Sequence, residues 1–69
     1  MKFKAGELVR WTEEYADINM VRDAGIGVVI SAKQYAYRDL NYTLYKVYRN
    51  KHNDMENISE NNLQRLKGE

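Results

Sequence analysis

The sequence predicts a small all-β fold of about five short strands, with one helical turn before the last strand. The most apolar run, Gly25–Ser31, joins two glycines to three consecutive β-branched residues, the composition of a buried strand. Tyr42–Arg49 alternates in the manner of a half-buried strand. Proline is absent, and Gly, Asn, Asp and Ser occupy the segments between the apolar runs, where turns are expected.

Size and composition limit what such a fold can be. The chain has 69 residues and no cysteine, so we expect one domain over residues 1–69, without disulfides or thiolate-bound zinc. No apolar run approaches the roughly 20 residues that span a bilayer, and no signal-peptide pattern is present. We therefore expect a cytoplasmic protein. The net charge of +1 argues against strong nonspecific binding to nucleic acid.

Two strands are expected in the first half of the chain. Gly6 can adopt the positive φ of a sharp turn into the first strand, Leu8–Trp11. Residues 12–24 lack a clean period and are interpreted as a long, partly ordered loop. Gly25–Ser31 then forms the central strand, which the chain reaches through a tight turn at the glycines. Both of its faces are apolar, so we expect it to bend between two layers, and which face points inward stays open.

The second half is expected to complete the sheet. Its elements are a loop over residues 32–41, a strand Tyr42–Arg49, a turn Asn50–Asn53, a strand Asp54–Ile58, a helical turn over residues 59–62 capped by Ser59, and a strand Leu63–Leu66. In Tyr42–Arg49 we place Tyr45 and Val47 inside, because the opposite face carries Lys46. The expected core is Val9, Ile26, Val28, Val29, Ile30, Tyr45, Val47, Ile58, Leu63 and Leu66.

Four motifs occur in an order that carries a family resemblance. They are Phe3-Lys-Ala-Gly-Glu-Leu-Val9, Gly25-Ile-Gly-Val-Val-Ile30, Tyr45-Lys-Val-Tyr48 and Ile58-Ser-Glu-Asn-Asn-Leu-Gln-Arg-Leu66. Together they resemble SH3-like small β-barrels over most of Phe3–Leu66, apart from the two loops. The chain is also similar to small stand-alone proteins of tailed, T4-like bacteriophages of marine hosts. The resemblance implies no catalytic residues, and a barrel that presents loops or one sheet face to a protein, peptide or nucleic acid.

The residue types that commonly catalyse reactions or bind metals do not form a recognisable catalytic or metal-binding motif in this sequence. His52 is the only histidine and is expected in a solvated turn, so neither a metal site nor a Ser-His-Asp arrangement is indicated. The adjacent Glu13 and Glu14 would point apart on a strand or helix, and with Asp17 and Asp23 they are interpreted as a solvated acidic loop. We therefore expect a protein that is not an enzyme and binds no cofactor or metal.

Aromatic residues are the main functional signal. Six tyrosines and one tryptophan are many for this length, and exposed aromatic side chains make good anchors for a protein partner. The predicted protein-binding residues are Trp11, Tyr15, Tyr35, Tyr37 and Tyr48. The alternative role is packing, since Trp11 can instead cap an end of the barrel. The favoured function is a non-enzymatic protein-binding module, of the kind found as a small phage accessory or virion component.

Two alternatives remain. The first is a nucleic-acid-binding barrel, because cations interleave with the tyrosines in a segment that carries five cations and one carboxylate between residues 25 and 52. Its residues would be Lys33, Arg38, Lys46, Arg49 and Lys51. The acidic residues of 12–24 oppose this function. The second alternative is self-association through an outer strand face with Tyr42, Leu44 and Tyr48.

Overall fold

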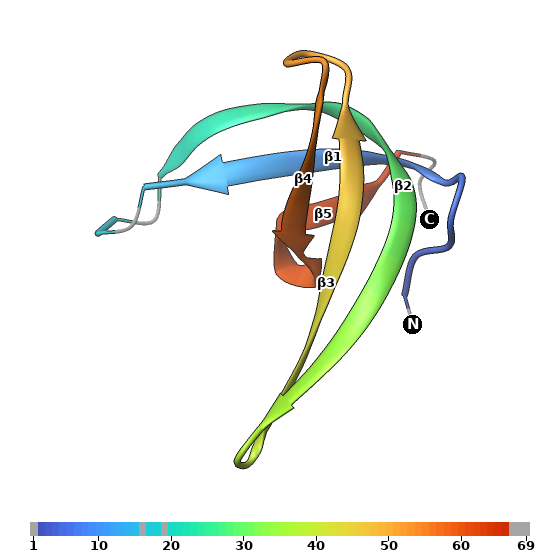
Figure 1. The fold of residues 1–69 in the computed structure, drawn as a ribbon. Coiled ribbons are helices and arrows are strands. Elements are labelled where there is room, and N and C mark those ends of the chain that lie inside the picture. The colour runs from blue at the N-terminus through green and yellow to red at the C-terminus, as the bar shows by residue number, and fades with distance from the viewer. Residues whose placement is uncertain (1, 16, 19, 67–69) are drawn as a thin grey trace.

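The fold is one open sheet of five antiparallel strands with a single 3₁₀ turn, which confirms the all-β prediction (Figure 1). The computed structural model describes residues 2–15, 17–18 and 20–66. The elements are β1 (Leu8–Glu14), β2 (Val21–Tyr37), β3 (Leu40–Arg49), β4 (Asp54–Ser59), η1 (Glu60–Asn62) and β5 (Leu63–Arg65). In space the strands follow the order β4-β3-β2-β1-β5, so the last strand pairs with the first.

The long strand β2 is the centre of the sheet, as its apolar run predicted. Its first half pairs with β1 and its second half with β3, and Gly27 and Val28 pair with both neighbours. The register with β3 shifts between Val29 and Ser31, which leaves Ile30 as an extra residue. Such a bulge bends a strand and increases its twist. The curl of β2 brings β1 and β5 behind β3 and β4 (Figure 1), with the core between them.

Both expected loops are too long, because paired strands extend into each of them. Within residues 12–24, β1 continues to Glu14 and β2 already begins at Val21. Within residues 32–41, β2 and β3 continue until only Arg38 and Asp39 form the turn between them. Arg38 takes the left-handed conformation there, with φ 56°. Residues 16 and 19 of the first expected loop lie outside the described residues. We name the described residues of 13–22 the β1–β2 hairpin and residues 31–46 the β2–β3 arm.

The pairing explains why these segments are strands despite their polarity. In the arm, Tyr35 lies opposite Tyr42 and Tyr37 lies opposite Leu40, so large side chains meet across the ladder. Cross-strand pairs of aromatic and aliphatic residues stabilise a two-stranded ribbon that has no core of its own. Each segment by itself shows only scattered tyrosines among polar residues. The pattern is regular only in the cross-strand pairs, whose second members lie on the other strand.

Among the described residues, eight side chains are buried and form one core. Six of them were predicted, namely Val9, Val29, Tyr45, Val47, Ile58 and Leu63. Phe3 and Trp11 complete the cluster. The inward orientation of Tyr45 and Val47 is confirmed, since both are fully buried.

Four predicted core residues are wrong. Ile26, Ile30 and Leu66 are exposed, and Val28 is only half-buried. The open question about the central strand is therefore answered, because Gly27 and Val29 point inward and their neighbours Ile26 and Val28 point outward.

Gly25 and Gly27 do not form the turn that the sequence pattern predicts. Both lie within β2, and only Gly6 has a positive φ among the described glycines, at 89°. Their role is close approach: a Cβ on Gly25 would lie 2.8 Å from Cζ2 of Trp11. The glycines leave the space in which the indole packs against the strand.

One buried hydroxyl fastens the N-terminal segment to the sheet. Tyr45 Oη accepts hydrogen bonds from the backbone N–H groups of Lys2 and Phe3, at 3.0 and 3.3 Å, and donates to Glu60 Oε2 at 2.8 Å. The ring of Phe3 packs edge-on against the ring of Tyr45, with centroids 5.4 Å apart. Phe3, which is absent from the expected core, is thereby a core residue.

Substitution Tyr45→Phe tests this connection. We expect the free energy of unfolding to fall by about 1–3 kcal/mol, because the buried N–H donors lose their acceptor. Urea denaturation followed by circular dichroism measures the change. The control is Tyr42→Phe on the exposed face, which should stay within about 0.5 kcal/mol of wild type. Equal losses for both variants would contradict this role of the Tyr45 hydroxyl.

The turns of the second half agree with the sequence. Residues 50–53 form the turn between β3 and β4, closed by a 2.8 Å hydrogen bond from Asn53 N–H to the Arg49 carbonyl. Ser59 caps the 3₁₀ turn, and its hydroxyl accepts from Asn61 N–H. Both predictions are confirmed.

Candidate functional site

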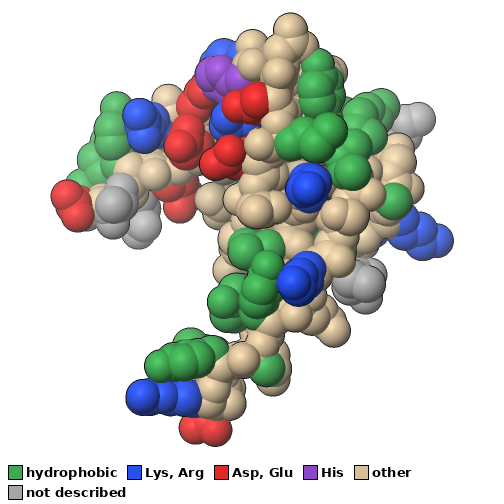
Figure 2. All heavy atoms as spheres, viewed as in Figure 1, with side chains coloured by type: hydrophobic (Ala, Val, Ile, Leu, Met, Phe, Trp, Pro, Cys, Tyr) green, Lys and Arg blue, Asp and Glu red, His purple; other side chains and the backbone are tan. Residues whose placement is uncertain are grey.

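The outer face of the sheet carries a row of apolar side chains that the core does not use. Leu8, Val28, Tyr48 and Met55 are directly paired across β1, β2, β3 and β4, so they project from the same face. Leu8 and Met55 at its two ends are 50% and 54% exposed. Figure 2 shows hydrophobic side chains gathered on this face, over the upper part of the sheet. We call these four residues the outer row.

Cations surround the outer row on the same face. Strand alternation places Arg10 beside it on β1 and Lys46 beside it on β3. Lys33 follows further along β2, opposite Leu44. A partner that covers the row therefore meets positive charge at its rim.

The outer face continues onto the β2–β3 arm, where tyrosines and cations alternate. The rings of Tyr35 and Tyr42 stack in parallel, with centroids 5.2 Å apart. The ammonium of Lys33 lies 5.4 Å from the ring of Tyr35, and the guanidinium of Arg38 lies 5.2 Å from the ring of Tyr37. Each of these cations is thus held over an aromatic face.

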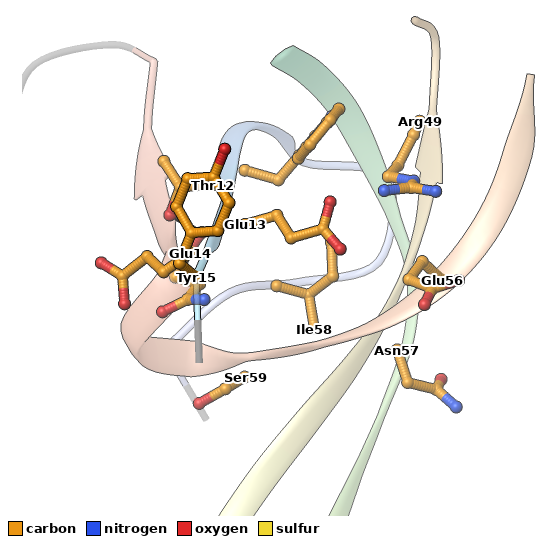
Figure 3. Close-up of a pocket in the computed structure, with 11 residues that line it drawn as sticks. Thr12, Glu13, Glu14, Tyr15, Arg49, Glu56, Asn57, Ile58 and Ser59 are labelled. Carbon is orange, nitrogen blue, oxygen red and sulfur yellow. Dashed lines mark hydrogen bonds between the residues drawn. The ribbon is translucent and has the colours of Figure 1, made fainter. Parts of the chain in front are cut away.

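A cleft of about 320 Å³ opens between the end of β1 and the β4–η1 segment (Figure 3). The buried Trp11 and Ile58 lie at its base, and the ring of Tyr15 stands at its wall. Glu13 extends into the cleft toward Arg49 and Glu56, whereas Glu14 points away on the other side of Tyr15. The expectation that Glu13 and Glu14 point apart is met.

Arg49 does not neutralise this cleft, because Asp54 already binds it. Its Nε and Nη2 donate to the two oxygens of Asp54 at 2.8 and 2.7 Å. The hydrogen bonds to Asp54 raise the pKa of Arg49, and those from Arg49 lower the pKa of Asp54. The guanidinium also lies 4.9 Å from the Trp11 ring. Glu13 and Glu56 lie in the cleft, and among the described residues Arg22 pairs with Glu13 at 3.7 Å. The described lining of the cleft is therefore net negative.

Asp23 joins the base of the β1–β2 hairpin to the turn between β3 and β4. Its carboxylate binds Lys51 Nζ at 2.5 Å and His52 Nε2 at 2.6 Å, and it also accepts from the Ala24 N–H. The imidazole of His52 lies against the ring of Trp11, with centroids 5.7 Å apart. The sequence pattern places Asp23 in a solvated loop and His52 in a solvated turn, because nothing local shows that two segments nearly thirty residues apart meet here.

This contact predicts a pH dependence of stability. The hydrogen bonds from Lys51, and then from His52, lower the pKa of Asp23 below its ordinary value. The unfolded chain therefore binds a proton at Asp23 more readily than the folded chain does. The contribution of Asp23 to the free energy of unfolding is present above about pH 4 and is lost as the pH falls further. We expect Asp23→Asn to lower the unfolding midpoint at pH 7 by more than it does at about pH 2.5–3. Thermal unfolding across this range measures it, with Asp39→Asn in the exposed arm turn as control. A pH-independent difference between Asp23→Asn and wild type would contradict the prediction.

The predicted protein-binding residues are divided between the core, the cleft and the outer face, where Tyr35, Tyr37 and Tyr48 lie. Trp11 is fully buried, so it belongs to the core, as the packing alternative had it, and is unavailable to a partner. Tyr15 lies at the cleft, Tyr35 and Tyr37 lie on the arm, and Tyr48 belongs to the outer row. They do not form one surface.

The predicted nucleic-acid set divides as well. Lys33, Arg38 and Lys46 remain on the arm, whereas Arg49 pairs with Asp54 and Lys51 pairs with Asp23. The third predicted surface, with Tyr42, Leu44 and Tyr48, does lie on one outward face of β3.

Leu8, Val28 and Met55 were not predicted as surface residues of a site. A signal existed for Leu8, which alternates with Val9 and therefore faces away from it. The sequence held no such signal for Met55, because its position beside Tyr48 depends on the register of β3 with β4.

Comparison of the chain with family models, curated proteins and solved structures found no match. Over residues 2–15, 17–18 and 20–66, no three His, Asp or Glu side chains gather in a way that could hold a metal ion. In the same part of the chain no helix has the length and apolar character needed to cross a membrane.

Proposed function

We propose that this chain is an SH3-like barrel that works as a protein-binding module, with the outer row as its docking surface. Three features support the fold assignment: the strand order β4-β3-β2-β1-β5, the 3₁₀ turn before the last strand, and the pairing of β5 with β1. The motif resemblance to SH3-like barrels supports it as well. The resemblance to small phage proteins supports a role as an accessory or virion component.

The outer row carries the functional part of the proposal. Four large apolar side chains in one line, two of them at least half exposed, are more than a monomer of this size needs to leave uncovered. The arrangement suits a protein partner because it runs across four neighbouring strands on the outer side of the curled sheet. With Arg10, Lys33 and Lys46 on the same face, the fitting partner presents apolar side chains rimmed by carboxylates.

The test uses a pair of matched methionines. Wild-type protein captures partners from a cell extract, and each partner is then purified and titrated by calorimetry against variants. Met55→Glu removes one end of the outer row and should raise the dissociation constant at least about tenfold. Met20→Glu, at a similarly exposed methionine outside the row, should leave it unchanged.

A second variant and a footprint complete the experiment. Leu8→Glu at the opposite end of the row should weaken binding as Met55→Glu does, and amide exchange should show protection along β3 and β4. The proposal fails if no captured protein depends on Met55 and Leu8, or if Met20→Glu weakens the same partner equally.

The contacts of Lys33 with Tyr35 and of Arg38 with Tyr37 favour a second candidate, binding of single-stranded nucleic acid by the arm. Only Lys33, Arg38 and Lys46 of the predicted cations are available for it. Three phosphate contacts give a slope of about −2 for the logarithm of affinity against the logarithm of salt concentration. Titration of a short single-stranded oligonucleotide at several salt concentrations measures this slope, and no binding at low salt would exclude the candidate.

A further inference from the structure

Two hairpins project from the sheet in different directions (Figure 1), and both expose apolar side chains. On the β1–β2 hairpin, Tyr15, Ile18, Met20 and Val21 are each at least half exposed. On the β2–β3 arm the same is true of Tyr37 and Leu40, and Leu40 reaches 66%. None of these side chains belongs to the core. The folded chain therefore leaves two separate apolar surfaces uncovered, in addition to the outer row.

The two hairpins carry opposite charge. The described part of the β1–β2 hairpin holds three carboxylates and one cation, namely Glu13, Glu14, Asp17 and Arg22. The β2–β3 arm holds three cations and one carboxylate, namely Lys33, Arg38, Lys46 and Asp39. Figure 2 shows acidic side chains on and beside the hairpin at the left and basic side chains along the arm below. Each surface is thus the electrostatic complement of the other.

These complementary surfaces diverge within one chain. The arm runs away from the sheet to its turn at Arg38 and Asp39, and the end of β1 points in another direction (Figure 1). A second copy, in contrast, can bring its arm to the β1–β2 hairpin of the first. The cleft beside that hairpin, with Tyr15 at its wall and Glu13 inside it, has a volume of about 320 Å³ and suits a protruding cationic side chain.

We propose that the protein associates with itself head to tail, the β2–β3 arm of one copy docking against the β1–β2 hairpin and cleft of the next. Arg38, at the arm turn, lies beside Glu13 and Tyr15 of the neighbouring copy. The interface joins two different surfaces, so a pair of copies leaves one arm and one hairpin unoccupied. Further copies can bind there, which gives a closed ring or an open filament. The four residues of the outer row take no part in the interface, although Lys33 and Lys46 lie on both proposed surfaces. The proposal does not rest on the proposed function.

The contact is weak and sensitive to salt. Because the contact is confined to two hairpins, we expect it to bury less than the roughly 800 Å² per partner of a stable interface. The charges are exposed and are screened once the Debye length falls to about 3 Å, near 1 M salt. Self-association is therefore expected at high protein concentration and low ionic strength.

Charge reversal with complementation tests the proposal. One variant carries Lys33→Glu and Arg38→Glu, and the other carries Glu13→Lys and Glu14→Lys. Sedimentation velocity should show the mass of the wild type rising with concentration at low salt and falling toward the monomer near 1 M. Each variant alone should associate at least about tenfold more weakly, because like charges then face each other. An equimolar mixture should associate again, since both contacts between the two variants are complementary.

A double variant Lys2→Glu and Lys4→Glu reverses the same number of charges away from both hairpins and should associate like the wild type. Circular dichroism verifies that every variant is folded. If a variant does not fold, the salt dependence of wild-type self-association tests the proposal instead. A wild type that stays monomeric up to about 1 mM, where even weak contacts of about −4 kcal/mol become populated, overturns the proposal. So does a mixture that fails to associate, or an arm that binds an oligonucleotide while the protein remains monomeric.

Discussion

Trp11→Ala is expected to destabilise the protein by about 3–5 kcal/mol, more than any other substitution proposed for this chain. The indole is fully buried, and its Nε1–H donates to the Ile26 carbonyl at 3.2 Å. Arg49 lies over one part of the ring and His52 beside it, so the cavity cannot close by a small shift of one neighbour. Domains of this size have little stability to spare, and the variant should be largely unfolded at 37 °C.

Urea denaturation measures the loss, with Tyr15→Ala as the exposed aromatic control, for which we expect a change within about 0.5 kcal/mol. If Trp11→Ala does not fold, Trp11→Phe provides the measurement, because it keeps much of the ring and loses the hydrogen bond to Ile26. A Trp11→Ala variant within about 1 kcal/mol of wild type would show that the indole is not a core residue.

Gly27→Ala should cost about 2–3 kcal/mol, although it adds a single methyl group. A Cβ at this position would lie 2.6 Å from the Tyr48 carbonyl oxygen and 2.6 Å from Val47 Cγ1. Tyr48 belongs to the neighbouring strand, and its carbonyl can move away only if the β2–β3 pairing opens locally. The strain therefore falls on the centre of the sheet.

Gly25→Ala provides the comparison, because the three atoms nearest to its Cβ would all belong to the side chain of Trp11, the closest at 2.8 Å. We expect Gly25→Ala to cost less than Gly27→Ala, and Ser31→Ala, on the exposed part of the same strand, to stay within about 0.5 kcal/mol. Chemical denaturation of the three variants ranks them. The reverse order for the two glycines would show that the Trp11 ring, rather than the backbone of β3, limits the space at this strand.

Local signals predicted the parts of the fold that depend on a few neighbouring residues. The β-branched run after Gly25 predicted a central strand, and Ser59 predicted the cap of the 3₁₀ turn. Gly6 has the positive φ that its turn requires. Alternation between Tyr45 and Lys46 correctly chose the inward face of β3. In each case the deciding interaction lies within a few positions along the chain.

The candidate sites were predicted far less well, because they depend on register. Tyr48 was recognised as an outward aromatic residue, yet its neighbours in the outer row come from three other strands. Arg49 and Lys51 looked like free cations, and each is paired with a carboxylate. The position of a charged residue in the sequence does not indicate which oppositely charged side chain lies beside it in the folded protein.

The amino-acid sequence was sufficient for the fold class, the central strand and most of the core, since periodicity and turn chemistry depend on neighbouring residues. Only strand pairing in three dimensions established that paired strands extend into residues 12–24 and 32–41 and that Trp11 lies inside against Gly25 and Gly27. The same pairing determined which apolar residues remain outside. These outcomes follow from long-range register, in which a shift of one residue exchanges the inner and outer faces of a strand.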